Sequence, residues 1–174
     1  GNAKKAQELL KEAGYDGTPI VLMASTDLPI LTNLGPVAKQ LMERAGFKVD
    51  MQSMDWQTLV ARRNKKDPAN AGGWNAFNTA WVSADILNPV LTAYMNAACD
   101  KALFGWPCDE KLEKLRNDFM KAPDLESQKK IAAEAQQEAV AYTTHIPLGE
   151  YSQPLAVRKN IDGIIDAAAP VFWN

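Results

Sequence analysis

The sequence predicts an α/β fold in which a mainly parallel sheet is flanked by helices. Residues 20–25, Ile-Val-Leu-Met-Ala-Ser, form a continuous apolar run that is typical of a strand buried on both faces. A helical pattern follows, and residues 47–52 then alternate between apolar and polar side chains, as in a half-buried strand. A strand, a helix and a strand joined by short turns form a βαβ unit, whose strands run parallel.

Apolar residues at helical spacing predict the helices around this unit. Residues 2–13 form the first, which ends at Gly14 as a C′ glycine. The helix between the two strands begins at a cap near Thr32 or Asn33, with Pro36 in its first turn. Its buried face is expected to comprise the residues that recur at helical spacing: Val37, Leu41 and Ala45, widened by Leu34, Ala38 and Met42.

A short helix is predicted over residues 56–64, where Asp55 is a suitable N-cap. A basic cluster lies at its end: Arg62, Arg63, Lys65 and Lys66. One interpretation is an anion site. The other, more common in proteins, is a solvated helix end whose positive charges interact favourably with the C-terminal end of the helix dipole.

The stretch over residues 74–85 begins as an apolar and aromatic run, typical of a strand, and ends in a polar loop before the turn-forming pair Asn88-Pro89. Ligands of α/β proteins bind beyond the carboxyl ends of strands, so this loop is a candidate ligand-binding edge. The alternative is that its aromatic residues belong to the core and its acid is a solvated loop residue: Trp74, Phe77, Trp81 and Asp85.

The second half of the chain is predicted to be mostly helical. A short helix is expected over residues 90–97, and two longer ones follow the N-cap residues Asp109 and Asp124. We expect these two to pack as an antiparallel pair that covers one face of the sheet. A last β stretch is predicted from His145 to about Val157, and His145 is interpreted as a packed boundary residue rather than a catalytic base.

Composition excludes some classes of function. The net charge of −2 offers no basic excess for a nucleic-acid partner. No apolar run approaches the ~20 residues that span a bilayer, and no signal peptide opens the sequence. We expect the natural chain to start upstream of Gly1, so the missing targeting segment excludes no compartment.

The two cysteines, Cys99 and Cys108, flank a segment with Gly105 and Pro107 that can fold back on itself, which favours a disulfide. Such a bond would stabilise the fold by roughly 2.5–3 kcal/mol and imply an oxidising compartment. The alternative is a pair of free thiols, which would permit a thiol-dependent enzyme using Cys99 or Cys108 with His145. A zinc site is not expected with a single histidine, and no catalytic triad or phosphate-loop motif predicts a catalytic residue, metal or cofactor.

Six segments carry a resemblance to a known family, in the same order along the chain: residues 4–15 (Lys-Lys-Ala-Gln-Glu-Leu-Leu-Lys-Glu-Ala-Gly-Tyr), 38–49, 55–63, 79–89 (Thr-Ala-Trp to Asn-Pro), 142–148 and 158–163 (Arg-Lys-Asn-Ile-Asp-Gly). On these segments the chain resembles the C-terminal lobe of the extracytoplasmic solute-binding proteins of ABC importers, in the dipeptide/oligopeptide-binding family 5. The resemblance implies a periplasmic-binding-protein-like lobe with a mixed, mainly parallel sheet flanked by helices.

The resemblance also implies an organisation and a role. Residues 1–160 would be the C-terminal solute-binding lobe, and the apolar tail over 161–174 would cross back to an N-terminal lobe of the same protein. The protein would be a periplasmic binding component, or a membrane-anchored lipoprotein in a Gram-positive source. It would deliver its ligand to a membrane permease and perform no chemistry.

The residues implied to bind the ligand are Trp81, Ser83, Asp85 and Asn88. Asp85 matches the family aspartate that pairs with the amino terminus of a peptide, although another cationic or polyhydroxylated solute also suits a carboxylate beside a tryptophan. A different class of function remains open from the residues alone, namely an interaction module whose apolar C-terminal tail docks a partner.

Overall fold

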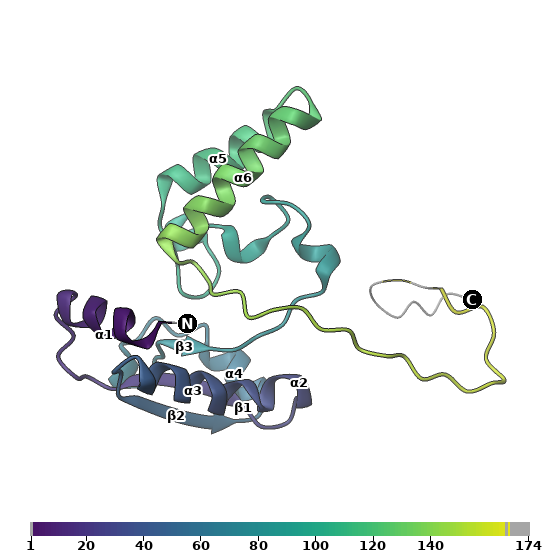
Figure 1. Cartoon of the computed structure of the whole chain (residues 1–174). Coiled ribbons are helices and arrows are strands. Elements are labelled where there is room, and N and C mark those ends of the chain that lie inside the picture. The colour runs from purple at the N-terminus through teal and green to yellow at the C-terminus, as the bar shows by residue number, and fades with distance from the viewer. Residues whose placement is uncertain (1, 166, 168–174) are drawn as a thin grey trace. The chain divides into compact units, whose positions relative to one another are not determined.

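The computed structural model describes residues 2–165 and 167. These residues divide into two compact units, with the boundary in the chain between Ala80 and Trp81 (Figure 1). The first unit contains a three-stranded sheet in the order β2-β1-β3, and both pairings are parallel. Its elements, in chain order, are α1 (Ala3–Glu12), β1 (Ile20–Ser25), α2 (Pro29–Thr32), α3 (Leu34–Arg44), β2 (Val49–Met54), α4 (Trp56–Arg62), the 3-10 turn η1 (Ala69–Ala71) and β3 (Ala76–Phe77).

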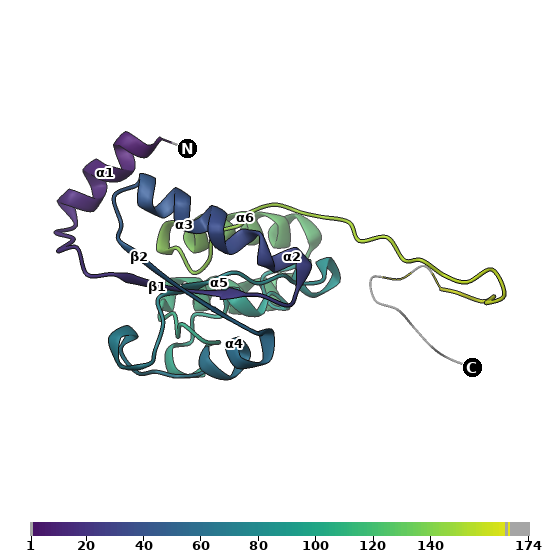
Figure 2. The ribbon, with the colours of Figure 1, turned by 90° about the horizontal axis from the view of Figure 1, so that it is seen from below.

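The central strand β1 forms the core of this unit, as predicted. Five of its six residues are buried, and Leu22 and Met23 are 1% and 0% exposed. The strand pairs with β2 from Ile20↔Val49 to Ser25↔Met54, and with β3 at Leu22 and Met23. Figure 2 shows α3 and α4 on opposite sides of these strands, which explains why β1 is apolar throughout.

The buried face of α3 differs from the prediction. Val37 and Leu41 are 52% and 55% exposed, whereas Gly35 is buried and Ala38 and Met42 are partly buried. The prediction is therefore wrong for Val37 and Leu41, whereas Ala45 and the residues that widen the stripe are partly buried as expected. The side that faces the sheet lies along Gly35, Ala38 and Met42. The reason is close approach: a Cβ atom on Gly35 would lie 2.7 Å from the Cβ atom of Ala24 in β1.

The second unit is built around the paired helices α5 (Glu110–Lys121) and α6 (Leu125–Tyr142), which lie side by side (Figure 1). The predicted caps are confirmed, since Asp109 accepts a hydrogen bond from the Leu112 N–H and Asp124 accepts one from the Ser127 N–H. The core of the unit is small and consists of Met95, Ala97, Leu112, Ala135 and Ala139. The helix pairing is confirmed. The sheet and the helix pair belong to different units, so the expectation that the pair covers the sheet stays a prediction.

Between β3 and α5 the chain contains only short 3-10 turns: η2 (Ser83–Ile86), η3 (Ala93–Met95) and η4 (Cys99–Lys101). The predicted helix over residues 90–97 is therefore wrong apart from the η3 turn. The predicted strand that opens at residue 74 is reduced to Ala76–Phe77, which pairs with Leu22 and Met23 of β1. The N–H of Asn75 also donates to the Val21 carbonyl oxygen.

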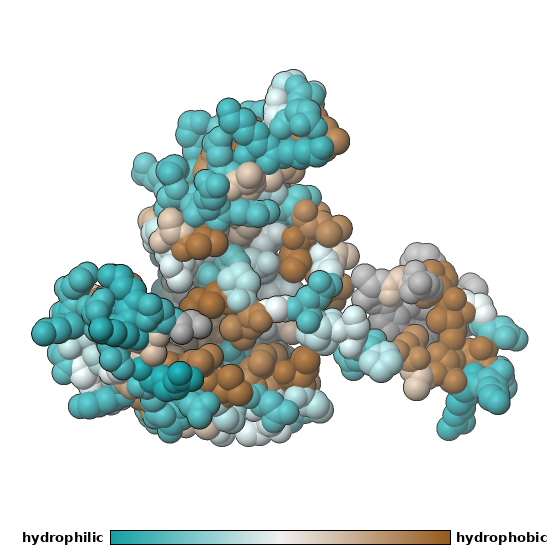
Figure 3. Space-filling view, in the orientation of Figure 1, coloured by the Kyte–Doolittle hydropathy of each residue, from teal (hydrophilic) through white to brown (hydrophobic). Residues whose placement is uncertain are grey.

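The predicted β stretch from His145 to Val157 is also wrong, since no strand is assigned there. A strand needs a hydrogen-bonded neighbour, and none of the described strands pairs with this segment. The apolar side chains of this segment are exposed: Ile146, Leu148, Tyr151, Leu155 and Val157. Exposed apolar residues continue beyond it at Ile161, Ile164 and Ile165, and Figure 3 shows apolar surface along the trailing segment. Val171, Phe172 and Trp173 of the predicted tail lie outside the described residues.

Candidate functional site

The predicted ligand-binding residues lie on one loop at the start of the second unit. Trp81 is 37% exposed, and Ser83 and Asp85 are exposed members of the η2 turn. The turn is closed by a 2.9 Å hydrogen bond from the Asp85 N–H to the Val82 carbonyl oxygen. The loop therefore presents an aromatic ring, a hydroxyl and a carboxylate to solvent within a few residues, a combination that suits an amphipathic cation.

Asn88 has a structural role in this loop. Its Oδ1 atom accepts hydrogen bonds from the N–H groups of Val90 and Leu91, at 3.0 and 2.9 Å. Its carbonyl oxygen accepts from the N–H and the hydroxyl group of Thr92, at 3.0 and 2.7 Å. An asparagine that caps its own turn in this way fixes where the loop ends and where the next segment begins.

Trp81 belongs to a row of three rings that the sequence did not reveal. Its ring centroid lies 5.9 Å from that of Tyr94 in an edge-to-face arrangement, and Tyr94 lies 4.1 Å from His145. Burial raises the pKa of the Tyr94 phenol and lowers the pKa of His145. A neutral, packed His145 agrees with its interpretation as a boundary residue. No periodicity links these three positions, so only the fold brings them together.

A second feature that the sequence did not reveal holds the segment after the loop. The guanidinium group of Arg116 donates to the carbonyl oxygens of Pro89 and Val90, at 2.9 and 3.3 Å, and to Oε1 of Glu113 at 2.5 Å. Glu113 Oε1 also accepts a 2.8 Å hydrogen bond from the Ala97 N–H. One salt bridge on α5 therefore ties down both ends of the chain between residues 89 and 97.

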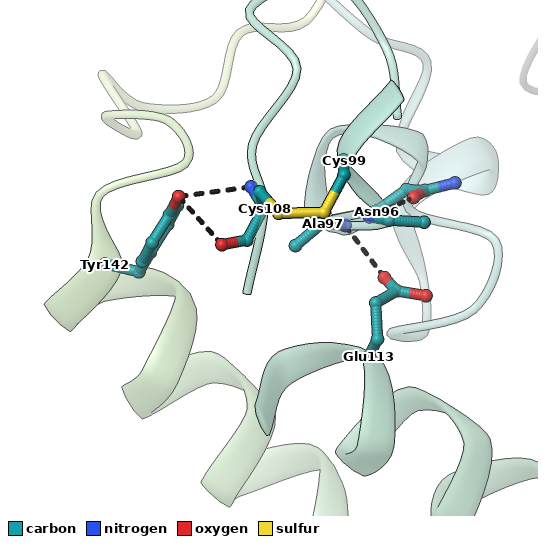
Figure 4. The surroundings of a disulfide bond; sticks show 7 residues. Asn96, Ala97, Cys99, Cys108, Glu113 and Tyr142 are labelled. Atoms are coloured by element: carbon teal, nitrogen blue, oxygen red, sulfur yellow. Dashed lines mark hydrogen bonds between the residues drawn. A yellow bond between two sulfur atoms is a disulfide. The ribbon is translucent and has the colours of Figure 1, made fainter. Parts of the chain in front are cut away.

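Cys99 and Cys108 form the predicted disulfide, with their Cα atoms 4.1 Å apart (Figure 4). The Tyr142 hydroxyl lies 3.1 Å from both the N–H and the carbonyl oxygen of Cys108, so the end of α6 contacts the bridged loop. Because both sulfur atoms are engaged in the bond, the structure offers neither residue as a free thiol for the nucleophile that a thiol enzyme requires.

In the basic cluster, Arg62 is engaged structurally. Its guanidinium group donates to Oε1 of Gln52 at 2.5 Å and to the carbonyl oxygens of Gly72 and Gly73 at 3.0 and 2.7 Å. The neighbouring Arg63 lies over the Trp56 ring, 5.7 Å from its centroid. Arg62 and Arg63 are therefore partly buried and engaged within the fold, which differs from the expected solvated helix end, whereas Lys65 and Lys66 are exposed.

The first unit has an open cleft of about 920 Å³. Its lining includes Ile20 and Val21 at the start of β1, together with the polar side chains of Asp16, Asp50 and Lys65. It therefore lies at the amino ends of the strands, whereas Trp81 follows the carboxyl end of β3. Within residues 2–165 no group of three or more acidic, histidine or cysteine side chains is placed to hold a metal ion.

Comparison with known proteins identifies the family. Residues 1–102 match the family described as "Bacterial extracellular solute-binding proteins, family 5 Middle". The whole chain is 33% identical to a probable peptide ABC transporter periplasmic-binding protein of Sinorhizobium fredii and spans 33% of that protein's length.

Solved structures support the same fold. The Bacillus subtilis oligopeptide-binding protein AppA in complex with a nonapeptide matches 82% of this chain and 30% of its own, with a TM-score of 0.59 and 18% identity. Helicobacter pylori DppA in complex with the peptide STSA matches 84% of this chain and 28% of its own, with a TM-score of 0.61 and 19% identity. The α/β lobe with a parallel sheet is thus confirmed, and the chain belongs to family 5 of the bacterial extracellular solute-binding proteins.

Proposed function

We propose that the protein containing this chain is the solute-binding component of an ABC transporter, which captures a peptide or similar small solute between two lobes and delivers it to a membrane permease. The observation that carries this proposal is the match to family 5 over residues 1–102, together with the relative named as a peptide transporter component. Two solved structures of similar fold, each in complex with a peptide, agree with a peptide as the proposed ligand.

The chain itself would be one wall of the binding cleft. It spans about a third of its Sinorhizobium relative, which is consistent with residues 1–160 forming a C-terminal lobe. The tail over residues 161–174 would cross back to the N-terminal lobe. Exposed apolar side chains on the described part of that tail support this course, because Ile161 and Ile164 are 52% and 47% exposed and would be buried by a second lobe.

The ligand would meet this wall at the loop that contains Trp81 and Asp85. A peptide has an ammonium group at its amino terminus, and a closed cleft removes that charge from water. The carboxylate of Asp85 would pair with it, because an unpaired charge in such a cleft is very costly. The Trp81 ring would cover the first residue of the peptide, and Ser83 and Asn88 would supply polar contacts.

The compartment follows from the same proposal. We infer an extracytoplasmic location, in the periplasm or as a membrane-anchored lipoprotein in a Gram-positive source, consistent with the disulfide between Cys99 and Cys108. Within the described residues no helix has the length and apolarity to cross a membrane.

Native mass spectrometry of the full-length protein, followed by identification of any co-purified ligand, tests the peptide class. Calorimetry would then compare tetra-alanine with its N-acetylated form. Loss of a charge-assisted hydrogen bond predicts roughly 10- to 150-fold weaker binding for the acetylated peptide, and for Asp85→Asn. Glu134→Gln, an exposed acid on α6, is the matched control. A co-purified ligand without an amino group would contradict a peptide as the ligand, and full affinity in Asp85→Asn would contradict the proposed role of Asp85.

A further inference from the structure

Trp81 is the large side chain of the candidate site, and an exposed tryptophan can adopt several rotamers. Ordering it only when the ligand arrives would reduce affinity, because immobilising a side chain on binding costs conformational entropy. With 37% of its surface exposed, Trp81 is not fixed by complete burial. Its orientation must therefore come from specific neighbours, and the rings described above supply them.

Tyr94 is the direct neighbour. Its ring meets that of Trp81 at 61°, with centroids 5.9 Å apart, which lies within the favoured range for edge-to-face pairs. Tyr94 is itself anchored, because it packs against the buried cluster around Met95 and Leu112. It also follows Thr92, which is 2% exposed and bonded to Asn88. The Trp81 ring thus contacts a partly buried side chain that packs against the core.

His145 is a second ring neighbour of Tyr94. The two ring centroids lie 4.1 Å apart at an angle of 55°. Nδ1 of His145 lies 2.9 Å from the hydroxyl of Thr144, which orients the imidazole. His145 follows α6, so the row joins the start of the unit, the η3 turn and the end of the helix pair.

We infer that Tyr94 and His145 are positioning residues, which hold the Trp81 ring in its ligand-facing orientation before the ligand binds. The expected effect on ligand affinity rests on the proposed function. The orientation of the Trp81 ring does not, because it is a property of the free protein. The occupant it prepares for is the first residue of a peptide whose ammonium group pairs with Asp85.

Fluorine NMR of the ligand-free, full-length protein labelled with 5-fluorotryptophan tests the orientation. The Trp81 resonance is assigned with Trp81→Phe. Neighbouring rings displace this resonance from its position in the unfolded protein, so Tyr94→Leu and His145→Leu should both move it back toward that position. Tyr94→Phe keeps the ring and should restore the native resonance. Tyr142→Leu, which removes a tyrosine ring outside the row, is the matched control.

Calorimetry with tetra-alanine tests the consequence. Tyr94→Leu should weaken binding roughly 2- to 13-fold, the range for loss of one aromatic pair, and Tyr94→Phe should recover it. If the wild-type protein binds no peptide, the proposed function fails for this ligand and the resonance alone decides the inference. A Trp81 resonance that is unchanged in both leucine variants, or that moves equally in Tyr142→Leu, would overturn it.

Discussion

Replacing Arg116 with methionine should release the segment that follows the candidate loop. Methionine keeps most of the apolar stem of the side chain and removes the guanidinium group. The variant would lose the hydrogen bonds to the carbonyl oxygens of Pro89 and Val90 and the salt bridge with Glu113. With side-chain exposures of 12% for Arg116 and 25% for Glu113, this pair is largely shielded from water.

The magnitude follows from these contacts. Hydrogen bonds to a charged group contribute about 1.5–3 kcal/mol each, and loss of one partner of a fully buried pair costs about 3–5 kcal/mol. Partial exposure of Glu113 reduces that penalty, so we expect a loss of about 2–4 kcal/mol of local stability. Because tenfold corresponds to 1.36 kcal/mol, backbone amides of the segment should exchange about 30- to 900-fold faster.

Hydrogen exchange of the full-length protein measures this effect at the amides of Thr92, Met95 and Ala97. The control is Lys114→Met on the same helix, because Lys114 forms a surface pair with Asp118 and is 73% exposed. Exposed pairs contribute about 0–1 kcal/mol, so exchange should change less than about fivefold. The reasoning is refuted if Arg116→Met accelerates exchange no more than the control does, or accelerates it equally throughout the first unit.

Three further predictions concern stability. Gly35→Ala should lower the urea midpoint by overpacking against Ala24, at a cost of about 1–3 kcal/mol, whereas a higher midpoint would mean that helix propensity outweighs this contact. Replacing Cys99 and Cys108 with serine should lower the unfolding free energy by roughly 2.5–3 kcal/mol. Thiol titration of the native protein should find neither cysteine reactive, and two reacting thiols would exclude the disulfide. Burial lowers the pKa of His145, so its contribution to stability is complete above the unfolded pKa of about 6.5 and is lost as the pH falls below it. Thermal unfolding between pH 7.5 and 5.5 should show this loss, and an equal loss in His145→Phe would assign it to other groups.

Local sequence patterns predicted much of the fold. The apolar run over residues 20–25 identified β1, and the side chains of Asp109 and Asp124 identified the starts of α5 and α6. These features depend on neighbours a few residues away, as a cap bonds within one turn and a buried strand is apolar along its length. The proximity of the two cysteines in the chain likewise indicated the disulfide.

The candidate loop was also predicted from sequence, but its surroundings were not. The stretch after β3 was recognised from its aromatic and polar residues, whereas the ring row and the Arg116 salt bridge were missed. The face of α3 was predicted too wide, because Val37 and Leu41 are as apolar as the residues that pack on the sheet. Only the closeness of Gly35 to Ala24 distinguishes the two faces.

The sequence by itself therefore determined the order and type of most elements, the family, and the loop on which a ligand site is proposed. The tertiary structure decided which apolar face of α3 is buried and which residues support Trp81. The physical reason is range: periodicity and capping are set by adjacent residues, whereas Trp81, Tyr94 and His145 meet only when α6 and the η3 turn pack together. The segment after His145 shows the same limit, because a strand-like sequence forms no strand without a partner to pair with.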